Sequence, residues 1–570
     1  MPFEVEWAER IITMNLTIKQ ISSLPKVQLD SQLDYPEINS VELLRGERYS
    51  YQIAFRANMY YDVRFVIEGE LAPYIRVYQV NQSPYDCVVS DMKGFTDPDY
   101  ISHTTGLMPD LLTPLPNVFG NVHTSLLAAS LRVEVNLPRD IEPGVYKVKA
   151  KMLNQDGKTI AEKVMRITVL DEEIKEQSLI YTRWFYADCI SDYHGVEIYS
   201  DRHFELIEGY IREAVDCGIN MILVPIHTPP LDTAVGTYRP CVQLVDIEKN
   251  GDKYLFSFKN FDRFIEICKK VGVKYYEMAH MFSQWGAKCA APIQVSENGV
   301  KDYMFGWHVN STDPLYTEFL KQYIKAVSDR LAYHGVQENT YFHISDEPSL
   351  DKIDAYKAAS EIIRPLIGKA HTMDALSNYD FYEQGLVECP VTPVHHINEF
   401  LKHKVDNQWT YYCVGPQYGF INSFIGTPGW RLRILGLLMY KYNIKGFLHW
   451  GMNFYNSPLS LCNINPYVTT SANRSWPSGD PFIFYPAKNG SYPSIRAKVT
   501  AEAIGDMDLC RTLEEYIGRE AVVRIIDKLA GKPLCFDDFP KGEEYIFAVR
   551  DKLIRTLKTA KKNVKLNKTE

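Results

Sequence analysis

The chain has 570 residues, which is too many for one ordinary hydrophobic core, so we expect at least two domains. Hydrophobic residues make up 46% and charged residues 23%, as is ordinary for a globular protein. The net charge of -9 leaves no overall basic field for nucleic acid, and no apolar run is long enough for membrane insertion.

The cysteines and the N-terminal residues bear on the compartment. The 11 cysteines are scattered and odd in number, with no CxxC pair and no zinc-ligand spacing, as is typical of reduced thiols in the cytosol. The opening residues MPFEVEWAERIITMNLTIKQ lack the charged-then-apolar layout of a signal peptide. The sequence therefore predicts a cytoplasmic protein.

The aromatic content is high, at 13% with 38 tyrosines and 8 tryptophans. Planar side chains stack on sugar faces, and phenols donate hydrogen bonds to hydroxyls, so this composition suits carbohydrate binding. A large aromatic core accounts for it equally well.

Short alternating strands fill the first part of the chain. Apolar and polar residues alternate at period two in several runs separated by turns, and Asp156-Gly157 between two such runs is a strong hairpin signal. This pattern predicts a β-sandwich domain over residues 1–172. The runs cover residues 49–57, 61–69, 131–138, 144–153 and 161–170.

After a charged boundary segment the pattern changes to strands alternating with helices. One helical face is formed by Phe204, Ile207, Ile211 and Ala214. Eight strand candidates with helices between most of them predict a (β/α)8 TIM-type barrel over residues 173–530, followed by a C-terminal helical extension, 531–570, packed on the barrel. The strand candidates lie at 179–185, 220–226, 273–282, 340–348, 369–376, 391–399, 408–416 and 444–455.

Polar and aromatic residues collect where these strands end. In a (β/α)8 barrel the chemistry is built at the carboxyl ends of the strands, so the collection predicts a substrate site there. For any single member, a polar loop residue is an equally good explanation. The members are His227, His280, Asp346, Glu347, Asp374, Asn398, Glu399, Tyr412 and Trp450.

Two adjacent carboxylates, Asp346 and Glu347, end the fourth strand in the stretch YFHISDEP. The simplest explanation is a helix start, with Asp346 as N-cap and Pro348 in the first turn. The other explanation is a catalytic pair.

Several reaction classes have no support in the sequence. His395 and His396 are adjacent and point to opposite faces of a strand, the motif H-E-x-x-H is absent, and so is the nucleophile elbow G-x-S-x-G. The dinucleotide and P-loop glycine patterns are absent as well. We therefore expect no catalytic metal and no cofactor.

Glycoside hydrolysis remains, with one difficulty. A retaining glycosidase places its acid and its nucleophile on different strands, about 5 Å apart, whereas neighbours on one strand diverge. The difficulty disappears if a 2-acetamido group of the substrate is the nucleophile. Asp346 then stays ionised and orients the acetamide, and Glu347 is the acid and later the base, which requires a raised pKa at Glu347.

At these residues the chain resembles glycoside hydrolase family 123. The resemblance rests on FHISDEPS, GFLHWGMNFYN, WPSGDPFIFYP and SIRAKVTAEAIGDMD, and it covers nearly the whole chain. It implies an exo-acting, retaining β-N-acetylgalactosaminidase that acts on glycosphingolipid-type glycans by substrate assistance, with a terminal β-linked N-acetylgalactosamine (GalNAc) as the group removed.

The resemblance also implies roles for individual residues. The acid pair of the family maps onto Asp346 and Glu347, and Trp450 matches an aromatic sugar platform. Most of the downstream signature is expected to shape the loop after the barrel and to hold the C-terminal helix, with Asp480 or Tyr485 touching the substrate. This signature comprises Trp476, Gly479, Asp480, Tyr485, Pro486, Ser494 and Arg496.

Two alternatives stay open at this point. One is a glycosidase of different sugar specificity with a separate carboxylate nucleophile, such as Glu399 or Glu277. The other is a non-catalytic carbohydrate-binding protein in which the acid pair only caps a helix, so that Asp346→Asn costs about 1 kcal/mol of stability.

Overall fold

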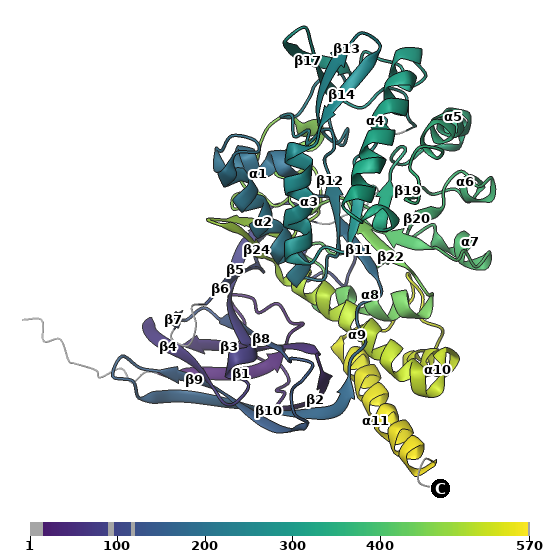
Figure 1. The fold of residues 1–570 in the computed structure, drawn as a ribbon. Helices are drawn as coiled ribbons and strands as arrows, with labels where there is room; N and C mark the ends of the chain where they lie inside the picture. The colour runs from purple at the N-terminus through teal and green to yellow at the C-terminus, as the bar shows by residue number, and fades with distance from the viewer. Residues whose placement is uncertain (1–14, 89–95, 116–119, 285, 568–570) are drawn as a thin grey trace, which may run out of the picture. The chain divides into compact units, whose positions relative to one another are not determined.

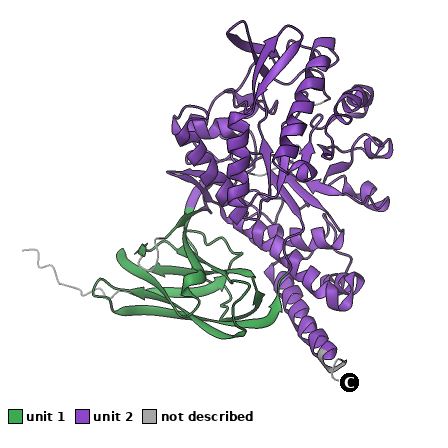
Figure 2. Ribbon diagram, in the orientation of Figure 1, with its two compact units in different colours: residues 1–81, 112–174 green, residues 82–111, 175–570 purple. Residues whose placement is uncertain are grey.

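The computed structural model describes residues 15–88, 96–115, 120–284 and 286–567. The chain forms two compact units, one built from residues 1–81 and 112–174 and the other from residues 82–111 and 175–570 (Figure 2).

The first unit holds two five-stranded sheets with one shared core. Buried residues of both sheets, among them Tyr51 and Val133 from one and Val148 and Ile167 from the other, form a single hydrophobic cluster. The sheet order β1-β3-β8-β5-β6 joins Leu16–Ser22, Arg48–Ala57, Ala129–Asn136, Ile75–Tyr85 and Gly106–Pro114, of which residues 82–85 and 106–111 belong to the second unit. The order β2-β10-β9-β4-β7 joins Ser40–Arg45, Thr159–Glu173, Gly144–Leu153, Tyr61–Glu68 and Gly120–Thr124.

The predicted hairpin is confirmed. Strands β9 and β10 pair antiparallel, and Gly157 lies between them with φ +80°, a conformation that glycine adopts without a Cβ penalty. Its N–H donates to the carbonyl of Asn154 and closes the turn.

The second unit is centred on a closed barrel of eight parallel strands, in the order expected from the sequence (Figure 1). All eight strands are almost fully buried, which explains why they appear as continuous apolar runs rather than alternating ones. The barrel strands are β11 (Ile180–Arg183), β12 (Met221–Val224), β15 (Tyr275–Met278), β18 (Thr340–Phe342), β19 (His371–Ala375), β20 (Cys389–Pro393), β21 (Trp409–Tyr411) and β22 (Gly446–His449).

Helices connect the strands and cover the barrel on its outside (Figure 1). On α2 the predicted face is confirmed, since Phe204, Ile207, Ile211 and Ala214 are buried, and Ser200 caps the helix by accepting from the N–H of His203. The helices are α1 (Ala187–His194), α2 (Asp201–Asp216), α3 (Lys259–Val271), α4 (Pro314–Tyr333), α5 (Ile353–Ile363), α6 (Asp380–Glu383), α7 (Ile397–Lys402) and α8 (Gly429–Lys441).

Two small sheets and three C-terminal helices complete this unit. Helix α11 packs on α9 and α10, as expected of a helical C-terminal region. The sheets contain β13 (Asp246–Asn250), β14 (Lys253–Ser257), β16 (Ile293–Glu297) and β17 (Val300–Phe305), and the pair β23 (Phe484–Ala487) and β24 (Gly490–Pro493). The helices are α9 (Ile495–Ile517), α10 (Arg519–Ala530) and α11 (Glu543–Asn567).

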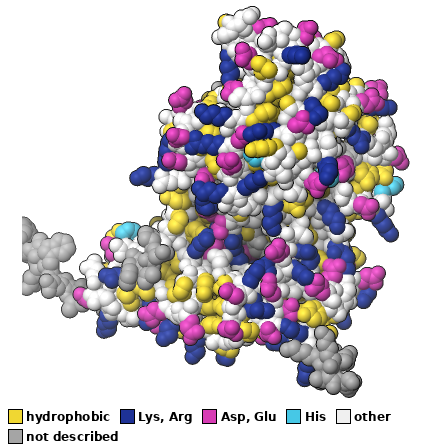
Figure 3. Space-filling view, in the orientation of Figure 1, with side chains coloured by type: hydrophobic (Ala, Val, Ile, Leu, Met, Phe, Trp, Pro, Cys, Tyr) yellow, Lys and Arg dark blue, Asp and Glu magenta, His cyan; other side chains and the backbone are white. Residues whose placement is uncertain are grey.

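The surface carries acidic and basic side chains in mixture, as the visible face in Figure 3 shows. Within the described residues, no helix combines the length and the apolar character that crossing a bilayer requires.

A fully buried arginine, Arg496, holds the start of α9. Its guanidinium forms two hydrogen bonds of 2.9 Å with the carboxylate of Asp110, and Tyr485 donates to the same carboxylate at 2.7 Å. Arg496 also donates to the carbonyl of Gly479 at 2.6 Å, and Ser494 caps α9. These contacts join the loop after the barrel to the helix, which is the role expected for the downstream signature.

Removing the carboxylate of Asp110 should therefore destabilise the protein strongly. Asp110→Ala leaves the Arg496 guanidinium buried without its counterion, so we expect a loss of about 3–5 kcal/mol in the free energy of unfolding. In the control Glu318→Ala, which breaks an exposed pair with Lys321, the loss should stay below about 1 kcal/mol. Denaturant unfolding measures both, and equal losses in the two variants would contradict the structural role of this pair.

Candidate active site

The acid pair lies in the loop that follows β18. The next helical turn begins at Leu350, with Ser349 at its N-cap position, and α5 begins at Ile353. Asp346 is therefore three residues upstream of the N-cap position, and the helix-cap explanation of the pair does not hold.

Asp346 is buried, with 6% of its surface exposed. The Nε2 of Gln284 donates to its Oδ2 at 2.9 Å. The orientation of this amide is fixed, because the Oε1 of Gln284 accepts from the N–H of Asp232 at 2.6 Å. One carboxylate oxygen of Asp346 is thus held by the protein, which leaves Oδ1 to accept from a ligand.

Burial and, to a smaller extent, the negative charge of Glu347 raise the pKa of Asp346 to about 8, while the hydrogen bond from Gln284 and the charge of His343 act in the opposite direction. The largest cause of this shift is that the carboxyl group of Asp346 is withdrawn from water, which disfavours its charged form.

Glu347 has different surroundings from Asp346. Its side chain is exposed, and its backbone has φ +45°, which is uncommon for a residue with a Cβ and typical of functional sites. Its N–H donates to the carbonyl of Ala375 at 3.1 Å, and the phenol of Tyr411 donates to its Oε1 at 2.6 Å. Burial raises the pKa of Tyr411 well above its usual value, so the phenol keeps its proton and remains a donor.

Both carboxylates line one cavity of about 180 Å³. Aromatic rings form much of its wall, which suits the apolar face of a sugar. Trp450 and Trp476 meet edge to face with ring centres 4.9 Å apart. The wall includes Trp184, Tyr186, Leu231, Asp232, Gln284, Ala375, Tyr411, Cys413, Val414, Leu448, Trp450 and Trp476.

Asp480 lies behind this wall and holds Trp450 in place. The indole Nε1 of Trp450 donates to its Oδ2 at 2.9 Å. Burial raises the pKa of Asp480 to about 7, with the hydrogen bond from Trp450 acting in the opposite direction. Asp480 therefore contacts a residue of the cavity wall and is not itself part of that wall.

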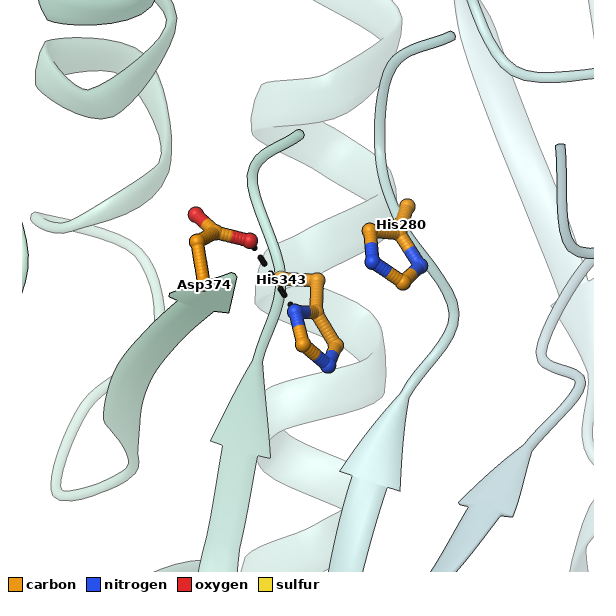
Figure 4. Close-up of side chains that lie close together, drawn as sticks. All are labelled: His280, His343 and Asp374. Atoms are coloured by element: carbon orange, nitrogen blue, oxygen red, sulfur yellow. Dashed lines mark hydrogen bonds and ion pairs between the residues drawn. The ribbon is translucent and has the colours of Figure 1, made fainter. Parts of the chain in front are cut away.

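A second group of charged side chains lies buried inside the barrel. His343 Nδ1 is 2.9 Å from Asp374 Oδ1 (Figure 4). His343 Nε2 is 2.5 Å from Glu277 Oε1. Trp184, a residue of the cavity wall, donates its Nε1–H to Glu277 at 2.6 Å. Burial alone would lower the pKa of His343, but the two carboxylates raise it to about 10, so the ring is an imidazolium at neutral pH.

The ligand atoms of His280, His343 and Asp374 lie within 4.8 Å of one another, which is a spacing that could hold a metal ion (Figure 4). However, both nitrogens of His343 are directed at carboxylates, and an imidazolium has no lone pair for a metal. The rings of His280 and His343 stack face to face with centres 3.9 Å apart. The chemistry of this group is that of an ion-pair network.

One known protein family matches the chain in sequence. The model of the glycoside hydrolase 123 catalytic domain matches residues 184–513, which is more than half of the chain and contains the whole cavity wall. The chain belongs to glycoside hydrolase family 123. No curated protein matches it in sequence.

Solved structures with a similar fold include another member of family 123, from Clostridium perfringens, whose structural study concerns the hydrolysis of glycolipid glycans. It has 15% sequence identity and a TM-score of 0.74, and the match covers 97% of this chain and 100% of that one. At 15% sequence identity, this match shows that the two proteins share a fold. An endo-β-1,4-mannanase from Thermotoga petrophila matches with 12% identity and a TM-score of 0.35 over 58% of this chain and 77% of that one.

The other predicted site residues of this family 123 protein lie outside the cavity wall. His227, His280 and Asp374 are buried in the barrel, and the Nε2 of His227 is 2.8 Å from the carbonyl oxygen of His280. Asn398 and Glu399 are exposed on α7, and Glu399 pairs with Lys402. Tyr412 is buried, whereas its neighbour Tyr411 reaches the cavity, and Tyr485 belongs to the cluster around Arg496 described above.

Several site residues are missing from the sequence prediction. Tyr411 and Tyr412 are consecutive, and the sequence does not indicate which of them faces the acid pair. Trp184 directly follows β11, as Trp450 directly follows β22, so the reasoning that pointed to Trp450 applies to Trp184 as well. Gln284 lies six residues after the end of β15, in a loop without a recognisable motif, and no sequence signal points to it.

The raised pKa of Asp346 has a consequence for stability. A carboxyl group whose pKa in the folded state lies above its ordinary value of 3.8 contributes stability at low pH, and this contribution is lost as the pH rises toward 8. The Asp346→Asn variant has no carboxyl group to ionise at this position, so its stability does not fall in this way as the pH rises. Its amide oxygen can still accept the hydrogen bond from Gln284. We therefore expect the variant to be more stable than the wild type at pH 8, by on the order of a few kcal/mol, with the difference shrinking toward pH 4.

Thermal unfolding of the wild type and the variant at pH 4, 6 and 8 measures this difference. Glu361→Gln, an exposed change on α5, is the matched control and should show a small, pH-independent difference. If Asp346→Asn were less stable than the wild type by a similar amount at every pH, the account of a buried, costly carboxylate would be wrong.

Proposed function

We propose that the protein is an exo-acting, retaining β-N-acetylgalactosaminidase that removes terminal GalNAc from glycosphingolipid-type glycans by substrate-assisted catalysis. One observation carries the proposal. Two adjacent carboxylates line the same cavity but differ in their surroundings. Asp346 is buried and accepts a hydrogen bond from the amide of Gln284, whereas Glu347 is exposed and accepts one from the phenol of Tyr411. Such a pair suits two different tasks on one substrate.

The first task belongs to Asp346. Its free oxygen accepts from the acetamide N–H of the sugar, which turns the acetamide carbonyl oxygen toward the anomeric carbon. Oxygen attack expels the leaving group and forms a bicyclic oxazolinium ion, in which the positive charge lies close to the carboxylate. Both the N–H donor and this charge favour the ionised form of Asp346, so substrate binding works against the effect of burial on its pKa.

The second task belongs to Glu347. Its proton passes to the glycosidic oxygen as the bond to the anomeric carbon breaks. After the leaving group departs, the carboxylate accepts a proton from water, which attacks the anomeric carbon and reopens the ring with overall retention. The exposed position of Glu347 gives both the leaving group and the water access to it.

The size and lining of the cavity support exo action on one sugar. A volume of about 180 Å³ with tryptophans on its wall fits a single ring held by its apolar face. The choice of glycosphingolipid-type glycans is supported by the similar Clostridium perfringens structure, whose study concerns glycolipid glycans. The preference for GalNAc rests on the family resemblance of the sequence motifs. The cytoplasmic location stays a prediction from the sequence.

The alternative mechanism uses a separate carboxylate as nucleophile, and neither of its two candidates, Glu399 and Glu277, lines the cavity. Glu399 is exposed on α7, and Glu277 is bound by Thr182, Trp184 and His343 inside the barrel. Among the described residues, the third carboxylate of the cavity wall is Asp232. It is the residue that a conventional two-carboxylate mechanism would have to use.

Hydrolysis of aryl glycosides tests the proposal. We expect turnover of 4-nitrophenyl β-GalNAc but not of the corresponding β-galactoside, because only the former carries the internal nucleophile. Asp346→Asn should lower kcat at least a hundredfold, and Glu347→Gln should do so on substrates with poor leaving groups. The Asp232→Asn variant separates substrate assistance from a mechanism with a protein nucleophile. It should retain catalysis, because in the proposed mechanism Asp232 takes no part in bond making. Equal cleavage of the galactoside, or loss of activity only in Asp232→Asn, would contradict the proposal.

A further inference from the structure

Three exposed apolar side chains lie on two loops of the barrel, one after β12 and one after β22. Val235 has 80% of its surface exposed, Leu461 has 70% and Leu459 has 38%. Single exposed apolar residues are normal on a soluble protein, whereas a group of them marks a surface that binds something. We call these three residues the rim patch.

Hydrogen bonds hold the two loops of the rim patch together. The N–H of Ala234 donates to the carbonyl of Leu459 at 3.1 Å, and the N–H of Leu459 donates to Oδ2 of Asp232 at 3.0 Å. The hydroxyl of Ser460 donates to the carbonyl of Asp232 at 2.7 Å. Val235, which follows Ala234, is therefore presented on the same surface as the leucines.

The loop that carries the leucines is closed at its base. The N–H of Ser457 donates to the carbonyl of Cys462 at 2.8 Å, and the N–H of Cys462 donates to the hydroxyl of Ser457 at 3.1 Å. Between them, Leu459 and Ser460 have φ +57° and +52°, and Asp232 on the facing loop has φ +45°. Left-handed backbone is costly for residues with a Cβ and is concentrated at functional sites.

The rim patch adjoins the cavity that holds the acid pair. Leu231 and Asp232 are part of the wall of that cavity, and Asp232 is also the residue that binds the loop with the leucines. One aspartate thus connects the cavity to the rim patch, and a substrate in the cavity lies beside these apolar side chains.

The surroundings of the rim patch are unusually poor in charge. Between Lys445 and Arg474 the sequence contains no Asp, Glu, Lys or Arg, although such residues make up 23% of the chain, and residues 233–238 contain none either. Anionic lipids and nucleic acids are attracted by clusters of Lys and Arg, which these two segments lack. The chemistry of the rim patch therefore fits an uncharged, apolar partner, bound through burial of apolar surface.

We propose that the rim patch binds the surface of an electrically neutral lipid layer, from which the cavity takes the terminal sugar of a glycolipid. The side chains of Val235, Leu459 and Leu461 enter the boundary between head groups and acyl chains, as apolar side chains of peripheral proteins do. A glycolipid suits both surfaces at once, because its sugar fills the cavity while its tail stays in the lipid layer. The inference rests on the proposed function, since it takes the glycolipid as the substrate.

Flotation with vesicles of pure phosphatidylcholine tests the binding without any substrate. We expect the wild type to float with these vesicles, and the bound fraction to fall at least fivefold in the double variant Val235→Asn/Leu461→Asn, because its rim patch buries polar amides instead of apolar groups. Asparagine adds no charge beside the cavity. The control Val564→Asn changes an exposed valine on α11, outside the rim patch, and should float like the wild type.

Kinetics connect the binding to the reaction. The substrates are a GalNAc-terminated glycosphingolipid in phosphatidylcholine vesicles and the free oligosaccharide of the same glycolipid. In the double variant, the ratio of kcat/KM for the vesicle-bound substrate to that for the oligosaccharide should fall at least tenfold, and in Val564→Asn it should stay at the wild-type value. Neither Val235 nor Leu461 lines the cavity, so the activity that remains on the oligosaccharide reports that the variant is folded.

Three results would overturn the role of the rim patch and leave the proposed function in place. The first is a wild type that does not float, or floats only when phosphatidylserine is added. The second is a double variant with the flotation and the kinetic ratio of the wild type. The third is a wild-type dimer in light scattering that the double variant converts to a monomer, which would make the rim patch an interface between two copies. By contrast, failure of the wild type to cleave any GalNAc substrate overturns the proposed function, and the inference about glycolipids falls with it.

Discussion

The site depends on the burial of one carboxyl group beside another that stays in solvent. Asp346 is withdrawn from water in the loop that follows β18, and the next residue, Glu347, turns outward through a left-handed backbone. Two neighbours on a regular strand would point to opposite faces. Here the loop departs from strand geometry, so both acids reach the same cavity with different surroundings. The division of labour that we propose follows from this departure.

The barrel interior supports this arrangement electrostatically. Beneath the cavity, the imidazolium of His343 lies between the carboxylates of Glu277 and Asp374, and Trp184 connects this network to the cavity wall. A buried ion group of this kind is a poor source of net stability, since its desolvation offsets much of its attraction. It fixes the positions of its members, and its positive ring favours the ionised form of Asp346. The network thus acts against the effect of burial on the pKa of Asp346, at some cost to stability.

Much of the fold could be predicted from the sequence, because local patterns determine it. The alternating strands of the first unit, the hairpin at Asp156-Gly157 and the eight apolar strands of the barrel all follow from hydrophobic periodicity and turn residues. The acid pair could be found because it lies in the loop at the carboxyl end of a barrel strand, and Trp450 because it directly follows β22. Residues that act through contacts distant in sequence could not be found in this way. Gln284 contacts Asp346 across 62 positions, and the choice of Tyr411 over Tyr412 depends on the twist and register of a three-residue strand.

The central claim is that the acetamide of the substrate is the nucleophile and that Asp346 orients it. Inhibition by the thiazoline derived from GalNAc, a stable analogue of the bicyclic oxazolinium ion, tests this claim most directly. If the claim holds, the thiazoline inhibits the wild type at least a hundredfold more strongly than GalNAc does, and Asp346→Asn loses most of this preference. If the thiazoline binds no more tightly than GalNAc, or equally well to the wild type and to Asp346→Asn, the nucleophile is a group of the protein and the account is wrong.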